Sequence, residues 1–575
     1  MAPPKTLLRP RWCLLVLLFA CSAHAQAPLQ AGIDIDIEGA PRGVMQILKA
    51  YFEERDLTCA EGRPAWRREV KAVTREALDA LGYFAAETKL VMPAAGECVV
   101  EIDLGQRAQL VAWHIDFVDA VDADELARVR ALIPKVPTAF DPQVYNSIKQ
   151  TFRATLTDAG YADARFDVAE VDVSLENNHA EVNWRIVVGP RFVIAPLTIR
   201  QTVLSDELIR TLIEFEEGDY LVNRRLLETY DNLLSSDYFA SVRVSPALDR
   251  RVDGKVPVTI SATPANQWSY LAGPGFATDS GPRFRAEAEA RYLNKAGHRV
   301  GFSSLVSPVA GNVKSEYRWP YGNPNHEWYA LEARSAYGDT DTANSDIVSL
   351  GLRRTARIGR HWAQTSYMDY RWEDYDVSNQ EGRSQLLLFG SNFSYTSTID
   401  AARPRWGRSF NIDVRGGSRA LGSDNDVFQV RAQAKQIVPF LGRSRILIRA
   451  EAAYSWQRDF SELPASLRFF AGGDRSVRGY ALDSLGEEDE TGDVIGGDRL
   501  YVGSVEIDVP VRERWSVALF TDIGTAFFDR PNFSQSIGAG VRWYSPLGPI
   551  RIDLAHPMQD SDQAVRLHIS LGPDI

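Results

Sequence analysis

The sequence predicts an α+β protein in which three repeated β-α-α-β-β domains are followed by a 16-stranded transmembrane antiparallel β-barrel. Two patterns predict this fold class. A helix-end signature recurs at a nearly constant interval between residues 33 and 260, and from about residue 268 helical patterns give way to long alternating runs. Beyond the first 25 residues there is no run of about 18 apolar residues, so a closed barrel is the membrane-spanning structure that remains.

Composition and charge narrow the functional class. The chain has 575 residues, of which 45% are hydrophobic and 24% are charged, values typical of folded globular proteins rather than disordered ones. This length predicts two to four domains. The formal net charge of −12 is acidic, which argues against nucleic acid as the main partner.

Residues 1–25 have the features of a removable signal peptide. An apolar stretch from Cys13 to Ala20 is followed by the small-x-small sequence Ala23-His24-Ala25, and the basic residues that precede it are Lys5, Arg9 and Arg11. The chain is therefore expected to be exported. Leu18-Phe19-Ala20-Cys21 is similar to a lipoprotein box with Phe in place of a small residue, so lipidation of Cys21 stays an open alternative.

Two cysteines, Cys59 and Cys98, remain after the predicted leader. Export to an oxidising compartment favours a disulfide between them, and two inert buried thiols are the alternative. Two cysteines without a companion histidine cluster do not make a zinc site.

Three helix-end segments define the repeat. They are Leu78–Phe84, Leu156–Tyr161 and Leu234–Phe239, and their tyrosines, at positions 83, 161 and 238, lie 78 and 77 residues apart. Each segment ends an amphipathic helix and is followed by two alternating strands. We therefore predict domains at residues 31–106, 107–189 and 190–264, in which apolar helix stripes form the cores and open strand edges are available to an extended peptide.

Local signals place the ends of two of these helices. Asp141-Pro142 predicts an N-cap with proline at the first helical position, and Asn223 is a candidate cap for the third helix. The apolar stripe predicted for the third helix consists of Leu226, Leu227, Tyr230, Leu233 and Leu234.

Residues 265–575 alternate in the manner of barrel strands. A soluble sandwich needs large side chains on its buried face, whereas here the apolar face is rich in alanine and ends in aromatic residues, which suits lipid. The opposite face is densely charged, which suits a wet lumen. About 310 residues at about 19 per strand and connection predict 16 strands. One such face consists of Phe284, Ala286, Ala288, Ala290 and Tyr292.

One segment of this region, Asp459–Asp498, lacks a strand pattern. Loops of this length are usually functional or disordered. It contains Gly472–Tyr480, with the sequence Gly-Gly-Asp-Arg-Ser-Val-Arg-Gly-Tyr, and the acidic run Glu487–Glu490. That run lacks the ligand spacing of a calcium loop and is interpreted as a solvated loop.

Three such units ahead of a 16-stranded barrel, with Val477-Arg478-Gly479-Tyr480 in a long late loop, resemble the BamA/TamA superfamily of outer-membrane assembly and two-partner secretion proteins. Further matches are Gly503–Glu506, Phe520–Gly524, which fits an F-x-D-x-G motif, and Gly548–Asp553. The repeats then look like POTRA domains. Three units look like the TamA group, the translocation and assembly module subunits, since BamA-like chains carry five and two-partner transporters carry two. The chain departs from the family by ending at Gly572–Ile575, without a terminal aromatic residue.

Because side chains alternate along a strand, the carboxylates of Asp522 and Glu506 are predicted to point toward the lumen. Arg478 is the natural cation for them, because a planar guanidinium can bond both carboxylates. The resemblance implies that this contact fixes the loop inside the barrel together with Val477, Gly479 and Tyr480. A solvent-exposed turn with ordinary lumen charges is the alternative. The residues predicted to face lipid on these two strands are Trp515, Val517, Leu519, Ile523, Val505, Ile507 and Val509.

The two strands that close the barrel are poorly suited to tight pairing. The first contains Gly273, Pro274 and Gly275, and the last ends near Gly572 and Pro573. Proline removes a ladder donor and glycine weakens a strand. The resemblance implies a seam that opens here and templates an incoming strand, and a kink or frayed end without a gating role is the alternative.

The resemblance implies an insertase of the bacterial outer membrane with its N-terminal domains in the periplasm. Its clients are expected to be unfolded outer-membrane proteins such as autotransporters. It is expected to contact outer-membrane lipid, and its expected protein partner is an inner-membrane-anchored TamB-like protein. No catalytic, metal-binding or cofactor-binding pattern occurs in the sequence, so neither an enzyme nor a cofactor is expected. A two-partner-type secretion pore and a docking channel for a lipid-conducting partner are the alternatives.

Overall fold

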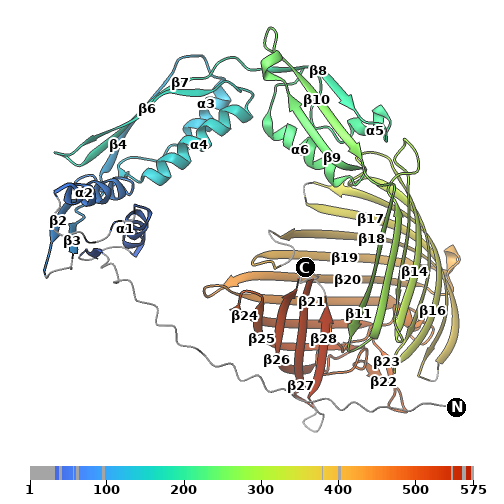
Figure 1. Ribbon diagram of the computed structural model, residues 1–575. Helices are drawn as coiled ribbons and strands as arrows, with labels where there is room; N and C mark the ends of the chain where they lie inside the picture. The colour runs from blue at the N-terminus through green and yellow to red at the C-terminus, as the bar shows by residue number, and fades with distance from the viewer. Residues whose placement is uncertain are drawn as a thin grey trace, which may run out of the picture. The chain divides into compact units, whose positions relative to one another are not determined.

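The computed structural model describes residues 33–571 apart from 38–41, 56, 58, 60–63, 94–97, 360, 379, 399–402, 546–547 and 560–564. The predicted signal peptide, with Cys21, lies outside the described residues. The chain divides into two compact units, Met1–Phe192 and Val193–Ile575, which are described separately below (Figure 1). In the described part of the chain, no helix combines the length and the apolar character needed to cross a membrane.

The first domain has the order β-α-α-β-β. It consists of β1 (Ile33–Asp36), α1 (Arg42–Glu54), α2 (Pro64–Asp79), β2 (Glu87–Val91) and β3 (Cys98–Asp103). The strands lie in the order β1-β3-β2, with β1 parallel to β3. Leu48 of α1, Val70 of α2 and Val100 of β3 are buried in one core. A disulfide joins Cys59 to Cys98, whose Cα atoms are 5.6 Å apart.

The second domain repeats this order with one short extra strand. It contains β4 (Gln109–Phe117), α3 (Ala123–Arg130), β5 (Thr138–Ala139), α4 (Pro142–Asp158), β6 (Arg165–Ser174) and β7 (His179–Val187), in the sheet order β5-β4-β7-β6. Asp141 caps α4 by accepting the N–H of Gln143 at 2.9 Å. Trp184 of β7 packs edge-on against Phe152 of α4, with ring centres 5.3 Å apart.

The third domain consists of β8 (Val193–Arg200), α5 (Asp206–Arg210), α6 (Asn223–Ser235), β9 (Phe239–Pro246), the 3₁₀ turn η1 (Leu248–Arg250) and β10 (Lys255–Pro264). Its strands lie in the order β8-β10-β9. The predicted cap at Asn223 is wrong, because Asn223 is already the first helical residue and Val222 precedes it without a side-chain cap.

The apolar stripe of α6 is narrower than predicted. Leu226 and Leu233 are buried against the sheet, but Leu227 is 63% exposed and Leu234 is 38% exposed. A three-stranded sheet covers only one face of a helix, so each second leucine of the two Leu-Leu pairs, about 100° further round the helix, faces outward.

The recurring signature is a helix C-cap. The residue before each tyrosine adopts a left-handed conformation, with φ of +83° at Gly82, +98° at Gly160 and +59° at Asp237. The N–H of Tyr83 donates to the carbonyl of Leu78 at 3.0 Å, which is the long bond of a Schellman motif. The repeated segment therefore marks the turn from helix to strand in each domain.

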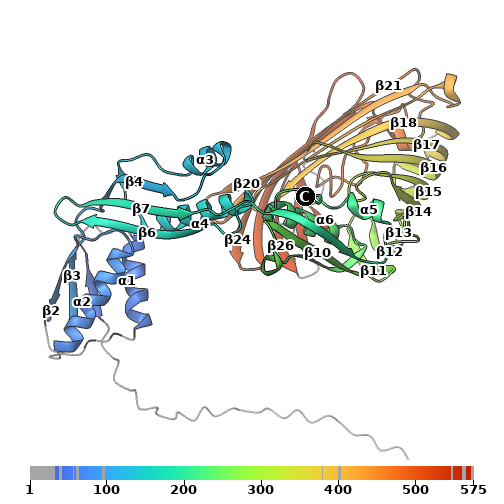
Figure 2. The same ribbon diagram turned by 90° about the horizontal axis from the view of Figure 1, so that it is seen from above.

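The C-terminal region forms a 16-stranded antiparallel sheet, which confirms the predicted fold class (Figures 1 and 2). Strands adjacent in sequence pair throughout, except that β21 pairs with β24 because the long loop lies between them. The strands are β11 (Trp268–Ala277), β12 (Gly281–Ala290), β13 (Arg299–Val306), β14 (Ala310–Pro320), β15 (Trp328–Asp339), β16 (Ala343–Ile358), β17 (Trp362–Val377), β18 (Gln380–Thr398), β19 (Gly407–Gly417), β20 (Val427–Phe440), β21 (Ser444–Gln457), β24 (Arg499–Arg512), β25 (Trp515–Phe527), β26 (Ser534–Ser545), β27 (Gly548–Pro557) and β28 (Arg566–Leu571).

The third domain contacts the barrel at two connections between strands. The hydroxyl of Tyr238 donates to the carbonyl of Gly297, between β12 and β13, at 2.7 Å. Arg299 of β13 places its guanidinium 4.2 Å from the centre of the Tyr238 ring. Asn325, between β14 and β15, donates to the carbonyl of Asn232 on α6 at 2.9 Å. The tyrosine of the third repeat therefore anchors this domain on the barrel.

Replacing both Cys59 and Cys98 with serine should destabilise the first domain. The two cysteines are 39 residues apart in the sequence. Closing a loop of this length lowers the conformational entropy of the unfolded chain and so raises its free energy by about 3–4 kcal/mol. In limited proteolysis of the full chain, the double variant should be cut within residues 33–103 at protease concentrations that leave the barrel intact. Equal cleavage of this domain in both proteins would contradict the expectation.

Candidate functional site

The long loop between β21 and β24 packs against the inner wall of the barrel. Val477 and Tyr480 of the loop are buried in one cluster with Leu500 and Val502 of β24. The loop is more regular than predicted, because it contains the 3₁₀ turn η3 (Ala465–Leu467) and the two-stranded ribbon of β22 (Glu487–Glu488) and β23 (Val494–Gly496). Part of the acidic run is therefore paired rather than irregular.

Arg478 is the centre of the site. Its Nε and Nη2 meet the two carboxylate oxygens of Asp522 at 2.7 and 3.0 Å, a side-on bidentate arrangement. Its Nη1 lies 2.9 Å from Glu506 and 3.0 Å from Asp553. The Arg478 backbone N–H also donates to Asp522 at 3.1 Å. One loop residue is thus bonded to β24, β25 and β27.

A second arginine completes this network. Arg542 of β26 is 2% exposed, lies 2.9 Å from Glu506 and is also paired with Asp553. We call Arg478, Glu506, Asp522, Arg542 and Asp553 the loop pin. Two guanidinium groups thus share three carboxylates, which leaves one negative charge uncompensated within the set. Breaking such a buried network from one side leaves unpaired charge behind.

Arg449 of β21 supplies a further positive charge beside the loop pin. It is electrostatically coupled to Asp522. Its guanidinium also donates to the carbonyl of Ser476 at 2.8 Å, two residues before Arg478. With Arg449 included, three guanidinium groups balance three carboxylates, and a fourth strand holds the loop.

Small residues make room for the loop. Gly479 has φ of +98°, and a Cβ there would lie 3.3 Å from Ser536. A Cβ at Gly524 would approach the Val477 side chain to 2.6 Å, so glycine at this end of the F-x-D-x-G motif lets the loop pack on the wall. The hydroxyl of Tyr480 donates to the carbonyl of Gln535 at 3.2 Å.

The first residue of the same motif also contacts the arginine. The guanidinium carbon of Arg478 lies 3.3 Å from the centre of the Phe520 ring, a close cation–π contact. Burial opposes the charge on Arg478, but hydrogen bonds and attraction to Asp522, followed by attraction to Glu506 and Asp553, outweigh burial and raise the pKa of Arg478. The arginine therefore stays charged in the closed structure.

The predicted seam residues lie on β11. Gly273, Pro274 and Gly275 pair in continuous antiparallel register with Arg285, Phe284 and Arg283 of β12, so they do not interrupt that ladder. Gly572 and Pro573 lie outside the described residues.

Gly275 serves a packing role that the sequence did not reveal. A Cβ at this position would approach Nε of Arg283 to 2.8 Å. The Arg283 side chain passes over this gap and donates to the carbonyl of Leu571 on β28 at 3.4 Å.

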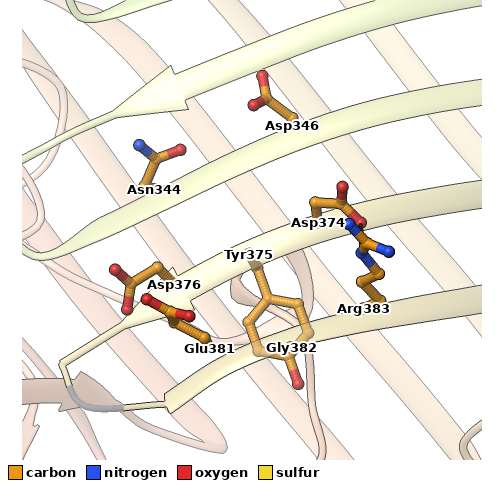
Figure 3. A pocket seen from close by; sticks show the side chains of 8 residues that line it. All are labelled: Asn344, Asp346, Asp374, Tyr375, Asp376, Glu381, Gly382 and Arg383. Carbon is orange, nitrogen blue, oxygen red and sulfur yellow. Dashed lines mark ion pairs between the residues drawn. The ribbon is translucent and has the colours of Figure 1, made fainter.

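A surface hollow of about 430 Å³ lies on the barrel at β16, β17 and β18 (Figure 3). Its lining is acidic, with one ion pair of 3.2 Å between Asp374 and Arg383, whose side chains are 63% and 87% exposed. No residue of the loop pin lines it. At such exposure the ion pair contributes little, and the hollow holds none of the buried charge found at Arg478.

Two residues of the loop pin were missed by sequence reasoning. Asp553 lay within a matched motif but was given no role, and Arg542 lay in none. The available signal was parity, since Arg542 alternates with the outward-facing residues Val541 and Trp543. An inward-facing charge on a strand is expected to have a partner.

Replacing Arg478 with alanine should release the loop. The change leaves the negative charges of Asp522, Glu506 and Asp553 without the Arg478 guanidinium. We expect it to reduce the stability of the folded loop by about 3–5 kcal/mol. Arg478→Lys should give an intermediate effect, because an ammonium cannot reproduce the side-on pair. Protease cleavage within residues 459–498 of the folded barrel measures the release. The control is Arg475→Ala, an exposed residue of the same loop; equal cleavage of the Arg475 and Arg478 variants would refute the assignment.

The loop should also respond to pH through Asp483. Burial, with added repulsion from Asp279, raises the pKa of the Asp483 carboxyl to about 6, above its unfolded value of about 3.9. The neutral form therefore favours the folded loop, so this contribution is fully present below about pH 4 and is lost as the pH rises through 6.

Asp483→Asn should accordingly stabilise the loop at pH 8 by about 2 kcal/mol and leave it unchanged at pH 4. Asparagine tolerates the φ of +55° found at this position. Loop proteolysis at the two pH values measures the difference. The same gain at both pH values would show that ionisation of Asp483 is not the cause.

Comparison with known proteins identifies a known domain in the barrel region. Residues 311–574 match the Omp85 superfamily domain. The outer membrane protein assembly factor BamA of Nitratidesulfovibrio vulgaris is 21% identical over 455 residues, covering 74% of this chain and 57% of that protein. BamA of Neorickettsia risticii is 21% identical over 420 residues, covering 66% of this chain and 54% of that protein. The chain thus spans a little over half the length of these relatives.

The fold agrees with this relationship. The crystal structure of BamA from Haemophilus ducreyi lacking POTRA domains 1–3 covers 80% of this chain and 99% of its own, with a TM-score of 0.63 and 18% sequence identity. The shared fold is a 16-stranded barrel preceded by POTRA-like domains. The barrel of this chain thus contains a match to the Omp85 superfamily domain, and the protein is an outer-membrane protein whose POTRA-like domains lie in the periplasm.

Proposed function

We propose that this protein is an outer-membrane assembly factor that promotes insertion and translocation of unfolded outer-membrane proteins, autotransporters in particular, through the seam between β11 and β28. The observation that carries the proposal is that these two strands are the two ends of the sheet. Among the described residues, β11 pairs in the sheet only with β12, and β28 only with β27. Relatedness to proteins named outer membrane protein assembly factors supports the same role here.

The mechanism follows from the chemistry of a strand edge. An edge presents unpaired N–H and C=O groups that an incoming strand can use as a template. In lipid such groups are costly unless they are paired, so a client strand that pairs with β11 or β28 lowers the barrier to its own insertion. Folding into the membrane is downhill, and the process therefore needs neither a nucleotide nor a catalytic residue.

The position of the loop favours insertion over secretion through the lumen. An unfolded chain passing through the barrel would have to displace the loop and break the buried contacts of Arg478. Insertion at the seam leaves those contacts in place. The proposed partner is an inner-membrane-anchored TamB-like protein bound to the POTRA-like domains, where β6 forms an open edge of the second sheet.

Locking the seam should abolish assembly activity. Thr278 lies opposite Ile569 across the seam, so Phe276 is expected to lie opposite Leu571 in this antiparallel arrangement, and cysteines at these two positions should form a disulfide. The purified protein in liposomes should accelerate protease-resistant folding of a denatured autotransporter barrel. The oxidised lock should remove this acceleration, and reductant should restore it.

The matched control is a cysteine pair at Ala286 and Ser304, which are paired neighbours on β12 and β13. This cross-link joins two strands away from the seam, and it also controls for reduction of the native Cys59–Cys98 disulfide. Equal folding with and without the seam lock would overturn the proposal in favour of a pore or a docking role.

A further inference from the structure

The described parts of the first and last strands meet at one short stretch of backbone. The N–H of Thr278, just after β11, donates to the carbonyl of Ile569 at 3.3 Å. In return the N–H of Ile569 donates to the side-chain oxygen of Thr278 at 3.0 Å rather than to a backbone carbonyl. A side chain therefore takes the place of a ladder acceptor at this point of the seam.

The same hydroxyl connects the seam to the long loop. Thr278 donates from Oγ1 to the carboxylate of Asp474, with distances of 3.1 and 3.3 Å to its two oxygens. The Asp474 carboxylate also contacts Nδ1 of His568 on β28, and the Asp474 backbone N–H donates to Asp279 in the turn after β11. One loop residue is thus bonded to both sides of the seam.

His568 links this group to the loop pin. Its Nε2 accepts the backbone N–H of Gly479 at 2.8 Å, and the side chain is 3% exposed. A backbone N–H can only donate, so Nε2 carries no proton, and the proton of the neutral ring lies on Nδ1, directed at Asp474. The imidazole therefore holds Asp474 on one side and the residue next to Arg478 on the other.

We propose that Thr278, Asp474 and His568 form a seam clasp, in which the folded loop, rather than strand pairing, holds the first and last strands together. These are positioning residues, acting on β11 and β28 through hydrogen bonds. The inference goes beyond the proposed function, because it concerns the closed state of the barrel whether or not any client uses the seam.

The contrast with ordinary strand pairs supports the clasp. β11 and β12 are in register over ten consecutive pairs, from Trp268–Ala290 to Ala277–Gly281. Across the seam, the described residues offer the Thr278–Ile569 exchange and the bond from Arg283 to the Leu571 carbonyl. Among the described residues, contacts through Asp474 therefore make up a large share of the bonds that join the two strands.

The tautomer of His568 also decides against a metal at this place. Donor atoms of Asp279, Asp474 and His568 lie within 4.8 Å of one another, a spacing that a cation can bridge. A metal on Nδ1 would force the ring proton onto Nε2, where it would face the N–H of Gly479. The hydrogen-bonded clasp satisfies every one of these groups without a cation.

The test measures the seam directly, in the full-length protein in lipid nanodiscs and without any client. Spin labels replace Tyr270 on β11 and Leu571 on β28, about 20 Å apart if the strands stay aligned. Pulsed electron paramagnetic resonance then gives the distribution of distances. The variants are Asp474→Ala and Thr278→Val, which keeps the side-chain shape and loses the hydroxyl, with Thr278→Ser as the conservative rescue.

We expect both Asp474→Ala and Thr278→Val to raise the population with long distances about fivefold or more, a change of the size produced by losing one hydrogen bond. Thr278→Ser should match the wild type, and the loop should stay protected from protease because Arg478 still holds it. A chelator should leave the distances unchanged.

Unchanged distances in Thr278→Val, or opening in Thr278→Ser equal to that in the valine variant, would overturn the clasp. Loop release in Thr278→Val would assign the effect to the loop pin instead, and opening on chelation would assign it to a metal. Because no client is present, none of these outcomes depends on the folding assay for the proposed function.

Discussion

The barrel depends on one buried ionic interaction, between Arg478 and the carboxylates of Asp522, Glu506 and Asp553. All of these groups are less than 10% exposed, so their charges are tolerated only as a set. A guanidinium is suited to this position because its planar fork bonds Asp522 side-on and still reaches two further carboxylates. The packing of Val477, Tyr480 and Phe520 around it follows from the need to exclude water from that set.

This interaction also explains how the barrel wall is held where the described residues of β11 and β28 do not pair as a ladder. A closed barrel normally owes its stability to an unbroken ring of strand pairs. Here the strands next to the seam are held from inside by a loop bonded to β24, β25, β27 and, through Gly479 and His568, to β28. The wall near the seam therefore keeps its shape without requiring β11 and β28 to form a long ladder.

Much of this structure could be predicted from local patterns. The tyrosine repeat, the alternation of Trp515, Val517 and Leu519, and the number of strands all reflect regular spacings along the chain. Arg478 and its two predicted carboxylates could be named because they lie in recognisable motifs. The positions of Glu506 and Asp522 on inward faces followed from parity alone.

The remaining features depend on contacts between distant segments. Thr278 and Ile569 are hydrogen-bonded neighbours, but almost the whole barrel sequence lies between them, and no local pattern marks either of them. Gly275 read as a weak point of a strand, although its missing side chain gives Arg283 a route to β28. Leu227 matched a helical stripe, but the sheet beneath α6 is too narrow to cover it. Sequence periodicity predicts which face of a helix is apolar, but it does not predict how much of that face the neighbouring sheet covers.

The order of residues along the chain gives the loop pin a consequence for biogenesis. The loop precedes every strand that supplies a carboxylate to Arg478, at positions 506, 522 and 553, and it precedes His568 as well. During assembly the loop therefore gains its full set of partners only when the last strands have joined the sheet. A barrel that lacks β27 and β28 also lacks the contacts of the loop with Asp553 and His568, so its loop is held by fewer bonds than in the finished barrel. Addition of the last strands to the sheet therefore adds bonds that hold a loop nearly a hundred residues earlier in the sequence.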